Sequence, residues 1–538
     1  MRKIVLVLII FLMAKISFAT VFYIDPVNGH NFGNGSLSDP WKTLEHVINN
    51  NKIESFSYIT PFDPNNPQLI IKNQDAPIKT GDTIMLYSGL HGNISIVNYI
   101  NDLEILVKAV VNETPILKTL HLQGAKEWKF EGISISSEPY GDYINNKLVF
   151  LESHAWQGPV SNIEINNCEI YSTTTAWSDT TNWINKASDG IIIKGDLIKI
   201  ENNNLQNIRF GISMRGDFID VKNNTISNFS GDGIRLLGSN NVIESNLIKN
   251  CYAVDNNHDD GIQAFTTGGL IVNNNIINKN IILNNEDANQ SLLGDLQGIG
   301  CFDGPFYNWT VENNLISVNH WHGISLYGAI NCNIINNTVI DPTPNIGSGP
   351  AWIKIADMTN YPSTNCVVKN NTANSFQLTN STISGNNSVL ATTSDYANNF
   401  VDYVNNDFHL ISTSVLIDQA DNSVAPIEDL EGNPRPSGAS SDIGAYEYIY
   451  TLNINENQIG NNLLAVFPNP FIEEITLSGT LNDVNIKIYD IHGKLILNET
   501  KQKLPVKFNL KSLIPGIYFV AVFFNNEKTL ASYKIIKE

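Results

Sequence analysis

The chain has 538 residues, with 33 Lys and Arg against 53 Asp and Glu, so its formal net charge is −20. This charge argues against nucleic acid or an anionic membrane as a partner, since both select basic surfaces. Charged residues are only 16%, which excludes a charge-swollen disordered chain. Asparagine is the unusual residue, with 76 copies, 35 of them between residues 201 and 375. Because Asn disfavours helices and suits turns, a long helical protein is excluded, which leaves disorder or a fold with many identical turns.

The first segment, residues 1–19, predicts a secretory signal peptide. Arg2 and Lys3 form a positive start, an apolar run covers 4–13, and small residues follow up to position 19. A membrane helix would need ~20 apolar residues, and Lys15 interrupts this stretch. We therefore predict export, with no transmembrane segment in the mature chain.

Five cysteines in an exported protein give only a weak disulfide signal. Cys332 and Cys366 each lie five residues before the second Asn of an Asn-Asn pair, so they could stack on neighbouring coils. A disulfide between them is an open alternative, and buried thiols are our prediction. The chain has no Cys-x-x-Cys or His-rich spacing typical of metal sites.

The middle of the chain repeats one pattern, in which an aliphatic residue is followed by two residues, Asn, one residue and an apolar residue. The repeated Asn are Asn203, Asn224, Asn246, Asn275, Asn314, Asn337 and Asn371, and an earlier copy has Cys168 at this place. The shortest spacings, 21 to 23 residues, predict coils of about 22 residues, and the longer spacings predict coils with insertions.

A second element precedes each Asn and reads Gly-Ile, or once Trp-Ile, with another apolar residue two places later. Its copies lie at 189–191, 210–212, 232–234, 260–262, 297–299, 322–324 and 351–353. This alternation predicts a strand with one buried side. Short strands, one fixed turn residue and a constant period predict an all-β solenoid, a right-handed parallel β-helix, with Asn side chains bonded from coil to coil.

Residues 20–450 resemble the pectate-lyase-like β-helix family. The repeat carries the resemblance, and other segments add to it: 23–26 and 40–44 near the start, 81–84 and 128–132 in the first coils, and 407–410, 429–436 and 442–447 at the close. We place the repeat core at about 160–390 and interpret both flanks as caps, because the end coils of a solenoid expose apolar core.

The C-terminal residues 463–538 have less Asn and more strand-like alternation. The segments 466–471, 488–494 and 513–518, with a Lys-rich end, resemble the C-terminal sorting domain of the type IX secretion system. This resemblance implies a small β-sandwich, type IX secretion machinery as a partner, and a secreted or cell-surface protein. Residues 451–462 are then a linker.

Equivalent positions of stacked coils form columns about 4.8 Å apart, so residues distant in sequence meet. Before the Gly stand Asp189, Phe210, Asp232, Asp260, Gln297, His322 and Ala351. Two places after it stand Ile192, Ser213, Arg235, Gln263, Gly300, Ser325 and Lys354, and four places after it Lys194, Arg215, Leu237, Phe265, Phe302, Tyr327 and Ala356. A plain solvated face would show interchangeable polar residues, whereas these columns gather acids, cations and aromatic residues on the middle coils.

Two features of these columns predict a site. Asp232 and Asp260 are column neighbours, and such a carboxylate pair repels unless a proton, a cation or an Arg relieves it. The turn before Gly261 adds His258 and Asp259, and the run 320–322 adds Trp321 between two histidines.

The family resemblance implies, first, a lyase that cleaves a uronate-containing polysaccharide by β-elimination. Such an enzyme neutralises the uronate carboxylate, removes the adjacent proton and protonates the leaving oxygen. Arg235, Gln263 and Lys354 are candidates to neutralise or abstract, His258 or His322 to act as base, and Tyr327 as acid. Arg215, Gln263 and Trp321 are candidate substrate-binding residues, and Asp232, Asp259 and Asp260 could hold Ca²⁺.

Two alternatives stay open. The motifs at 232–233, 259–261, 322–323 and 353–354 are similar to the series of the polygalacturonase family, in which paired Asp residues hydrolyse the glycosidic bond. However, 62 residues separate Asp260 from His322, room for an additional coil. The other alternative is a surface solenoid that binds glycans or adheres without cleaving them, since fold alone does not decide function.

Overall fold

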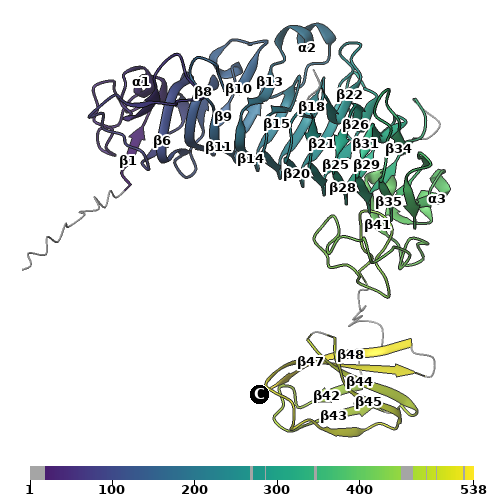
Figure 1. Ribbon diagram of the computed structural model, residues 1–538. Helices are drawn as coiled ribbons and strands as arrows, with labels where there is room; N and C mark the ends of the chain where they lie inside the picture. The colour runs from purple at the N-terminus through teal and green to yellow at the C-terminus, as the bar shows by residue number, and fades with distance from the viewer. Residues whose placement is uncertain are drawn as a thin grey trace, which may run out of the picture. The chain divides into compact units, whose positions relative to one another are not determined.

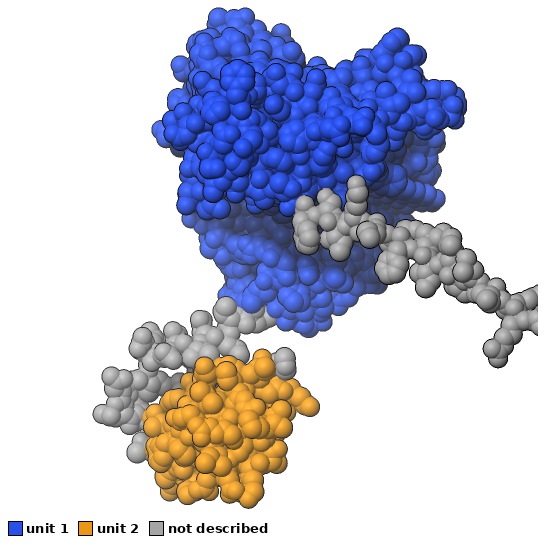
Figure 2. Space-filling model, turned by 90° about the vertical axis from the view of Figure 1, so that its left-hand side faces the viewer, with its two compact units in different colours: residues 1–449 blue, residues 450–538 orange. Residues whose placement is uncertain are grey.

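The computed structural model describes residues 19–266, 271–284, 286–343, 348–449, 464–479, 481–491, 493–524 and 528–538. The predicted signal peptide, apart from its last residue, and the predicted linker at 451–462 lie outside the described residues. The chain forms two compact units, residues 1–449 and 450–538, which Figure 2 shows in different colours. Among the described residues, no helix has the length and apolar character to cross a membrane.

The first unit is a right-handed parallel β-helix in which successive coils stack their strands in parallel (Figure 1). The Gly-Ile elements form the first stack, where each strand pairs with the next. Its members are β10 (Lys147–Glu152), β13 (Asp189–Lys194), β16 (Ile212–Arg215), β19 (Ile234–Leu236), β22 (Asp259–Phe265), β26 (Leu296–Asp303), β30 (His322–Tyr327), β34 (Trp352–Ala356) and β37 (Ser375–Gln377).

Two further stacks complete the coils, one on each side of the Asn turn. Before the turn lie β11 (Ser161–Asn166), β14 (Asp196–Glu201), β17 (Asp220–Lys222), β20 (Val242–Glu244), β24 (Ile276–Asn278), β28 (Thr310–Glu312), β32 (Asn333–Ile335), β35 (Val367–Lys369) and β38 (Ile383–Gly385). After the turn lie β12 (Glu169–Tyr171), β15 (Asn204–Ile208), β18 (Thr225–Phe229), β21 (Leu247–Cys251), β25 (Ile281–Leu283), β29 (Leu315–Ser317), β33 (Thr338–Ile340), β36 (Thr372–Ala373) and β39 (Ser388–Val389).

The repeated Asn forms a buried ladder along the solenoid. Asn224 Oδ1 accepts hydrogen bonds of 2.9 Å from both the backbone N–H and Nδ2 of Asn203, and Asn246 repeats this toward Asn224. The residue before each ladder position takes a left-handed conformation, as Asn202 does at φ 59°. Because Asn tolerates this conformation and also bonds its neighbours, it suits both places, which accounts for its abundance.

One predicted ladder member is wrong. The coil after Asn246 contributes Asn280 rather than Asn275, since Asn280 Oδ1 accepts from Asn246 and Asn314 Oδ1 accepts from Asn280. Asn275 instead accepts from the backbone N–H of Asn241, in a second, shorter ladder. Asn280 also fits the repeated sequence pattern. This coil contains an additional strand, β23 (Val272–Asn273), so its turn Asn comes later in the chain than the first match to the pattern. The matching short strands of the next coils are β27 (Phe306–Tyr307) and β31 (Ala329–Ile330).

All five cysteines are free and buried. The strand register pairs Asn333 with Val367, so Cys332 and Cys366 are neighbours on adjacent coils, as predicted. Their thiols donate to the backbone carbonyls of Phe306 and Ala329, at 3.5 and 3.3 Å. Buried thiols, rather than a disulfide, are therefore present.

Both ends of the solenoid are covered. The N-terminal part contains β1 (Val21–Ile24), α1 (Leu44–Asn49), the antiparallel pair β2 (Ser55–Tyr58) and β3 (Leu69–Lys72), β4 (Thr83–Leu86), β5 (Gly89–Leu90), the long β6 (Asn93–Ala109), β7 (Pro115–Leu117), β8 (Thr119–Glu131), β9 (Ser134–Ile135) and η1 (Glu138–Tyr140). An insertion carries α2 (Thr180–Lys186), and the C-terminal part contains α3 (Thr393–Ala397), β40 (Phe400–Asp402), η2 (Tyr403–Asn405) and β41 (Asp407–Leu410).

A buried ion pair holds the closing segment together. The side chains of Arg435 and Glu447 are fully buried, with Nη1 2.7 Å from Oε2. Arg435 also donates to the backbone carbonyls of Asp442 and Gly444, at 3.0 and 2.8 Å. These contacts tie the segment 442–447 to one guanidinium.

We predict that Arg435→Met lowers the free energy of unfolding by about 3–5 kcal/mol, because it leaves Glu447 buried without its cation. Denaturant unfolding of the full chain, followed by near-ultraviolet circular dichroism, measures the loss. The double variant Arg435→Met/Glu447→Leu should recover much of it. An unchanged unfolding transition in the single variant would contradict this role.

The second unit consists of two antiparallel sheets packed into a small sandwich. One sheet has β42 (Leu464–Phe467), β43 (Glu474–Gly479) and β46 (Val506–Asn509), and the other β45 (Leu495–Gln502), β44 (Val484–Asp490), β47 (Gly516–Phe524) and β48 (Lys528–Lys537). Their facing side chains, among them Ile475, Ile486 and Val520, form a core separate from that of the solenoid. This is the predicted fold for the end of the chain.

Candidate functional site

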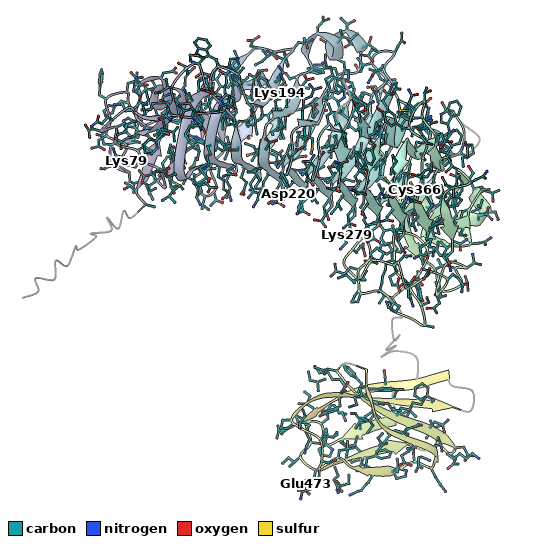
Figure 3. All side chains as sticks on the ribbon, in the orientation of Figure 1. Lys79, Lys194, Asp220, Lys279, Cys366 and Glu473 are labelled. Carbon is teal, nitrogen blue, oxygen red and sulfur yellow. The ribbon has the colours of Figure 1, made fainter. Side chains whose placement is uncertain are left out.

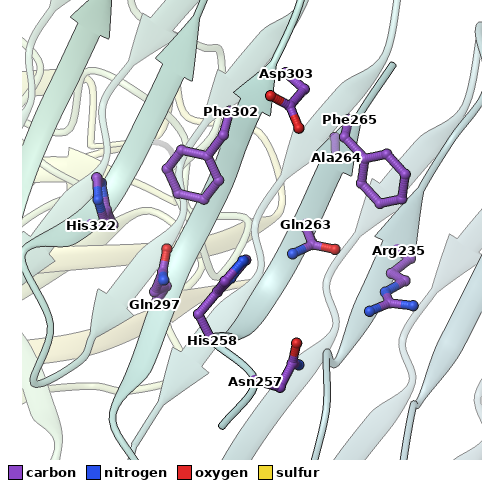
Figure 4. A pocket seen from close by; sticks show the side chains of 10 residues that line it. All are labelled: Arg235, Asn257, His258, Gln263, Ala264, Phe265, Gln297, Phe302, Asp303 and His322. Atoms are coloured by element: carbon purple, nitrogen blue, oxygen red, sulfur yellow. The ribbon is translucent and has the colours of Figure 1, made fainter. Parts of the chain in front are cut away.

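A pocket of about 510 Å³ opens on the first stack, over β19, β22, β26 and β30 (Figure 4). Its lining consists of Arg235, Asn257, His258, Gln263, Ala264, Phe265, Gln297, Phe302, Asp303 and His322. Four of the predicted site residues, Arg235, His258, Gln263 and His322, are thus brought together from three coils.

The predicted central column is confirmed. Register pairs join Ser213 to Arg235, Arg235 to Gln263, and on through Gly300 and Ser325 to the last member, Lys354. This register sets cationic, amide and hydroxyl side chains side by side at strand spacing.

The outer columns slip at two places. Phe265 pairs with Asp303, not Phe302, and His322 pairs with Trp352, not Ala351. Both shifts come from irregularities in the strands, which re-aim the side chains that follow. Asp303 enters the pocket through the first of them.

The floor of the pocket is the predicted pair Asp232 and Asp260, whose side chains have no exposed area. Asp232 Oδ1 accepts from the backbone N–H of Asp260 at 3.0 Å, and the other oxygen pairs with Arg235 Nε. Asp260 Oδ2 accepts from Gln263 Nε2 at 2.9 Å and lies 3.4 Å from His258 Nδ1. The repulsion of the pair is therefore relieved by an Arg and a His.

Burial governs the charges of this pair. It raises the pKa of Asp260 above the usual range of an Asp. It also raises the pKa of Asp232, although Arg235 opposes this. Asp260 Oδ1 has no hydrogen-bond partner and points at Gly300, where a Cβ would come within 2.1 Å of it. Only a residue without a side chain fits above this carboxyl group.

The pKa values of the two imidazoles of the pocket are shifted in opposite directions. The hydrogen bond to Asp260 raises the pKa of His258, whose side chain is 62% exposed. Burial lowers the pKa of His322 to about 4, so it is uncharged at neutral pH. The ring of Phe302 meets both edge-on, with centroids 6.2 Å from His258 and 4.8 Å from His322. The pocket thus holds two imidazoles of unlike basicity around one aromatic ring.

The predicted calcium ligands are not brought together. Adjacent strand residues point to opposite sides, so Asp259 turns away from Asp260. Its oxygens accept from Cys251 Sγ at 3.2 Å and Asn257 Nδ2 at 2.7 Å, and burial raises its pKa to about 7. Asp232 is already paired to Arg235, and within the described ranges no group of three or more His, Cys, Asp or Glu is arranged to hold a metal ion.

The remaining predicted residues lie beside the pocket. Lys354 Nζ sits 5.5 Å from the ring centroid of Tyr327 and 4.8 Å from that of Trp352. Trp321 stacks on Trp352 at 5.9 Å and is 42% exposed. Arg215 is exposed on β16, one coil before Arg235.

Six lining residues were absent from the predicted site, and one of them, Ala264, directly follows Gln263 on β22. Phe265, Phe302 and Gln297 belong to the predicted columns, so the register alone is enough to place them in the site. Asn257 belongs to the turn before β22, and Asp303 depends on the strand irregularity. A single sequence carries no signal for the last of these.

Comparisons with known proteins agree with this architecture. A family model described as a right handed beta helix region matches residues 149–339 and 189–389 in two overlapping copies. A model described as a secretion system C-terminal sorting domain matches residues 465–538. A search of curated proteins finds no match.

Solved structures with similar folds include three carbohydrate-active proteins. Pectate lyase Pel9A is 13% identical over 81% of this chain and 98% of its own, with a TM-score of 0.40. The lacto-N-biosidase from Eubacterium ramulus is 12% identical over 69% of this chain and 68% of its own, with a TM-score of 0.44. A PL6 family polysaccharide lyase from Pseudopedobacter saltans is 12% identical over 63% and 94%, with a TM-score of 0.36.

The sorting domain directs its carrier through the type IX secretion system to the cell surface or the extracellular space. The solenoid and its Asn ladder extend through the region that the β-helix model matches. The chain is therefore a right-handed parallel β-helix protein with a C-terminal type IX secretion sorting domain.

Proposed function

We propose that this protein is an extracellular lyase that cleaves a uronate-containing polysaccharide by β-elimination. The observation that carries the proposal is the arrangement of ionisable groups in two layers, one lining the pocket and one buried behind it. A guanidinium and two imidazoles with oppositely shifted pKa values line it, and two carboxyl groups lie buried against these side chains. Perturbed groups gathered in a pocket are typical of active sites.

The reaction assigns one task to each of these groups. Arg235 neutralises the uronate carboxylate, which makes the proton on the adjacent carbon, C5, more acidic. Uncharged His322 takes that proton, the electron pair of the C–H bond forms the C4=C5 double bond, and the bond from C4 to the leaving oxygen breaks. Protonated His258 donates its proton to that oxygen. Tyr327, the predicted acid, lies outside the pocket lining.

In the proposed reaction, Ser325 accepts a hydrogen bond from Nδ1–H of His322. Its Oγ accepts from Trp352 Nε1 at 3.1 Å and lies 2.8 Å from His322 Nδ1. A serine oxygen has two lone pairs, so it can also accept from Nδ1–H. That tautomer leaves Nε2 of His322 free to act as the base.

A hydrolase is the weaker alternative on this geometry. It needs two carboxyl groups that reach the sugar, and those of Asp232 and Asp260 have no exposed area. Among the described residues that line the pocket, Asp303 is the one acidic side chain. The strand β26 also separates β22 from β30, so the motifs compared with the polygalacturonase series are not on adjacent coils.

A non-catalytic solenoid gives no reason for buried acids. Binding alone does not require two carboxyl groups beneath the contact surface, and burying them costs free energy. A reaction that needs a charged imidazole does benefit from Asp260, because the hydrogen bond from His258 to Asp260 raises the pKa of His258.

Incubation of the purified chain with alginate, pectate and glycosaminoglycans tests the proposal. We expect new ultraviolet absorbance from the unsaturated product, in step with new reducing ends. Reducing ends without that absorbance would indicate a hydrolase. No product from any of these polymers would count against both activities and favour the binding protein.

Metal removal is a separate prediction. Because the three candidate carboxyl groups do not form one ligand set, we expect cleavage to proceed at an unchanged initial rate after treatment with EDTA. Initial rates with EDTA and with added Ca²⁺ provide the measurement. A rate that falls with EDTA and returns with Ca²⁺ would show that calcium acts at a place other than this floor.

A further inference from the structure

The face that carries the pocket differs on its two sides. Toward the N-terminus, Lys194 and Arg215 are register partners on β13 and β16, and both are exposed. Figure 3 labels Lys194 on this part of the solenoid. Toward the C-terminus, the exposed side chain is Trp321, just before β30. One side is therefore cationic and the other aromatic.

The cationic side is unusual in a chain with a net charge of −20. Like charges directly opposite on neighbouring strands repel each other. Glu152 provides partial relief, with Oε1 3.6 Å from Lys194 Nζ, whereas Arg215 forms no ion pair within the described part of the chain. An anionic group bound between Lys194 and Arg215 would remove this repulsion.

The aromatic side is built as a platform. The Trp321 and Trp352 rings are stacked with an interplanar angle of 14°, and Trp321 is 42% exposed. Trp352 is fixed in turn by its hydrogen bond to Ser325 and by Lys354 over its ring. A rigid, partly exposed indole suits the apolar face of a sugar ring. The ammonium group of Lys354 lies against the rings of Trp352 and Tyr327.

We propose that the substrate is a heteropolysaccharide in which uncharged sugars accompany the uronates. Anionic sugars extend from the pocket over Lys194 and Arg215, and an uncharged sugar stacks on Trp321. From β16 to β30 there are four coil steps, about 19 Å at strand spacing, so the two subsites contact different sugars of one chain. This inference rests on the proposed function and names its substrate class.

Binding measurements on the full chain test it without turnover. In a His322→Ala background, affinity electrophoresis with polygalacturonate, which has uronates alone, is compared with hyaluronan, which alternates uronates with uncharged sugars. Lys194→Gln/Arg215→Gln should weaken binding of both polymers about tenfold and reduce the dependence on salt. Trp321→Ala should weaken hyaluronan binding about fivefold and leave polygalacturonate binding unchanged.

Matched controls come from outside the pocket face. Lys199→Gln removes an exposed lysine of β14, and Phe218→Ala removes an aromatic side chain that is 56% exposed. Both should leave binding unchanged. The inference is overturned if Trp321→Ala affects both polymers equally, if the double variant changes neither, or if neither polymer binds. The expected binding pattern without cleavage by the native chain would overturn the lyase proposal and support the subsites.

Discussion

The His322→Ala variant is expected to lose about 10²- to 10⁴-fold in kcat, the usual contribution of a positioned general base. His322 is the pocket imidazole whose pKa burial lowers to about 4, so it stands ready to accept a proton at neutral pH. Initial rates of ultraviolet absorbance increase, at saturating polysaccharide, measure the loss. KM should change little, because Arg235 and Gln263 remain to bind the substrate.

Two comparisons separate a base from a structural residue. His322→Gln keeps a polar side chain next to Ser325 and Trp352 but has no basic nitrogen, so it should be as inactive as the Ala variant. Added imidazole should restore part of the activity of His322→Ala, because the cavity left by the ring can admit a small base. A His322→Gln variant with near-native kcat would remove His322 from the mechanism.

The fold was open to prediction because its signals are local and repeated. The Asn turn, the Gly-Ile strand and the alternation of apolar residues recur from coil to coil. Each recurrence predicts the same coil geometry, so many weak signals support one prediction. The exception is instructive: Asn275 and Asn280 both fit the spacing, and only the coil-to-coil hydrogen bond between Asn246 and Asn280 distinguishes them. In a coil with an insertion, the spacing between repeats cannot distinguish the two residues.

The part of the site that depends on the register between neighbouring strands could be predicted from the sequence. The columns placed Arg235 beside Gln263 and Asp232 beside Asp260, because parallel strands in register transmit position from coil to coil. They did not show that both Asp side chains are buried, nor that Asp259 turns toward Cys251. The burial of a side chain depends on which loops cover it. Because side chains alternate along a strand, acidic residues that are adjacent in sequence do not point to the same site.

The pH profile of the reaction should have an acid limb near pH 4, set by His322, since the base acts only when unprotonated. The alkaline limb should follow His258, which acts only while protonated. Its contact with Asp260 raises its pKa, so the contact keeps the enzyme active to higher pH. The plateau between the limbs therefore depends on a carboxyl group that never touches the sugar.

Replacing that group tests the layering directly. Asp260→Asn removes the negative charge beneath His258, lowers the pKa of His258, and should move the alkaline limb of kcat/KM to lower pH while the limb near pH 4 stays in place. Asp189→Asn is the matched control, because Asp189 occupies the same column but pairs with Arg209 at 3.1 Å, away from the pocket. It should leave both limbs unchanged.

The outcome also discriminates between reaction types. If Asp260 itself protonated a leaving group, as in a hydrolase, the Asn variant would lose activity at every pH. If Asp260 acts through His258, the variant keeps activity on the acid side and loses it on the alkaline side alone. An unshifted alkaline limb with a uniformly lower rate would contradict the role of Asp260 in charging His258.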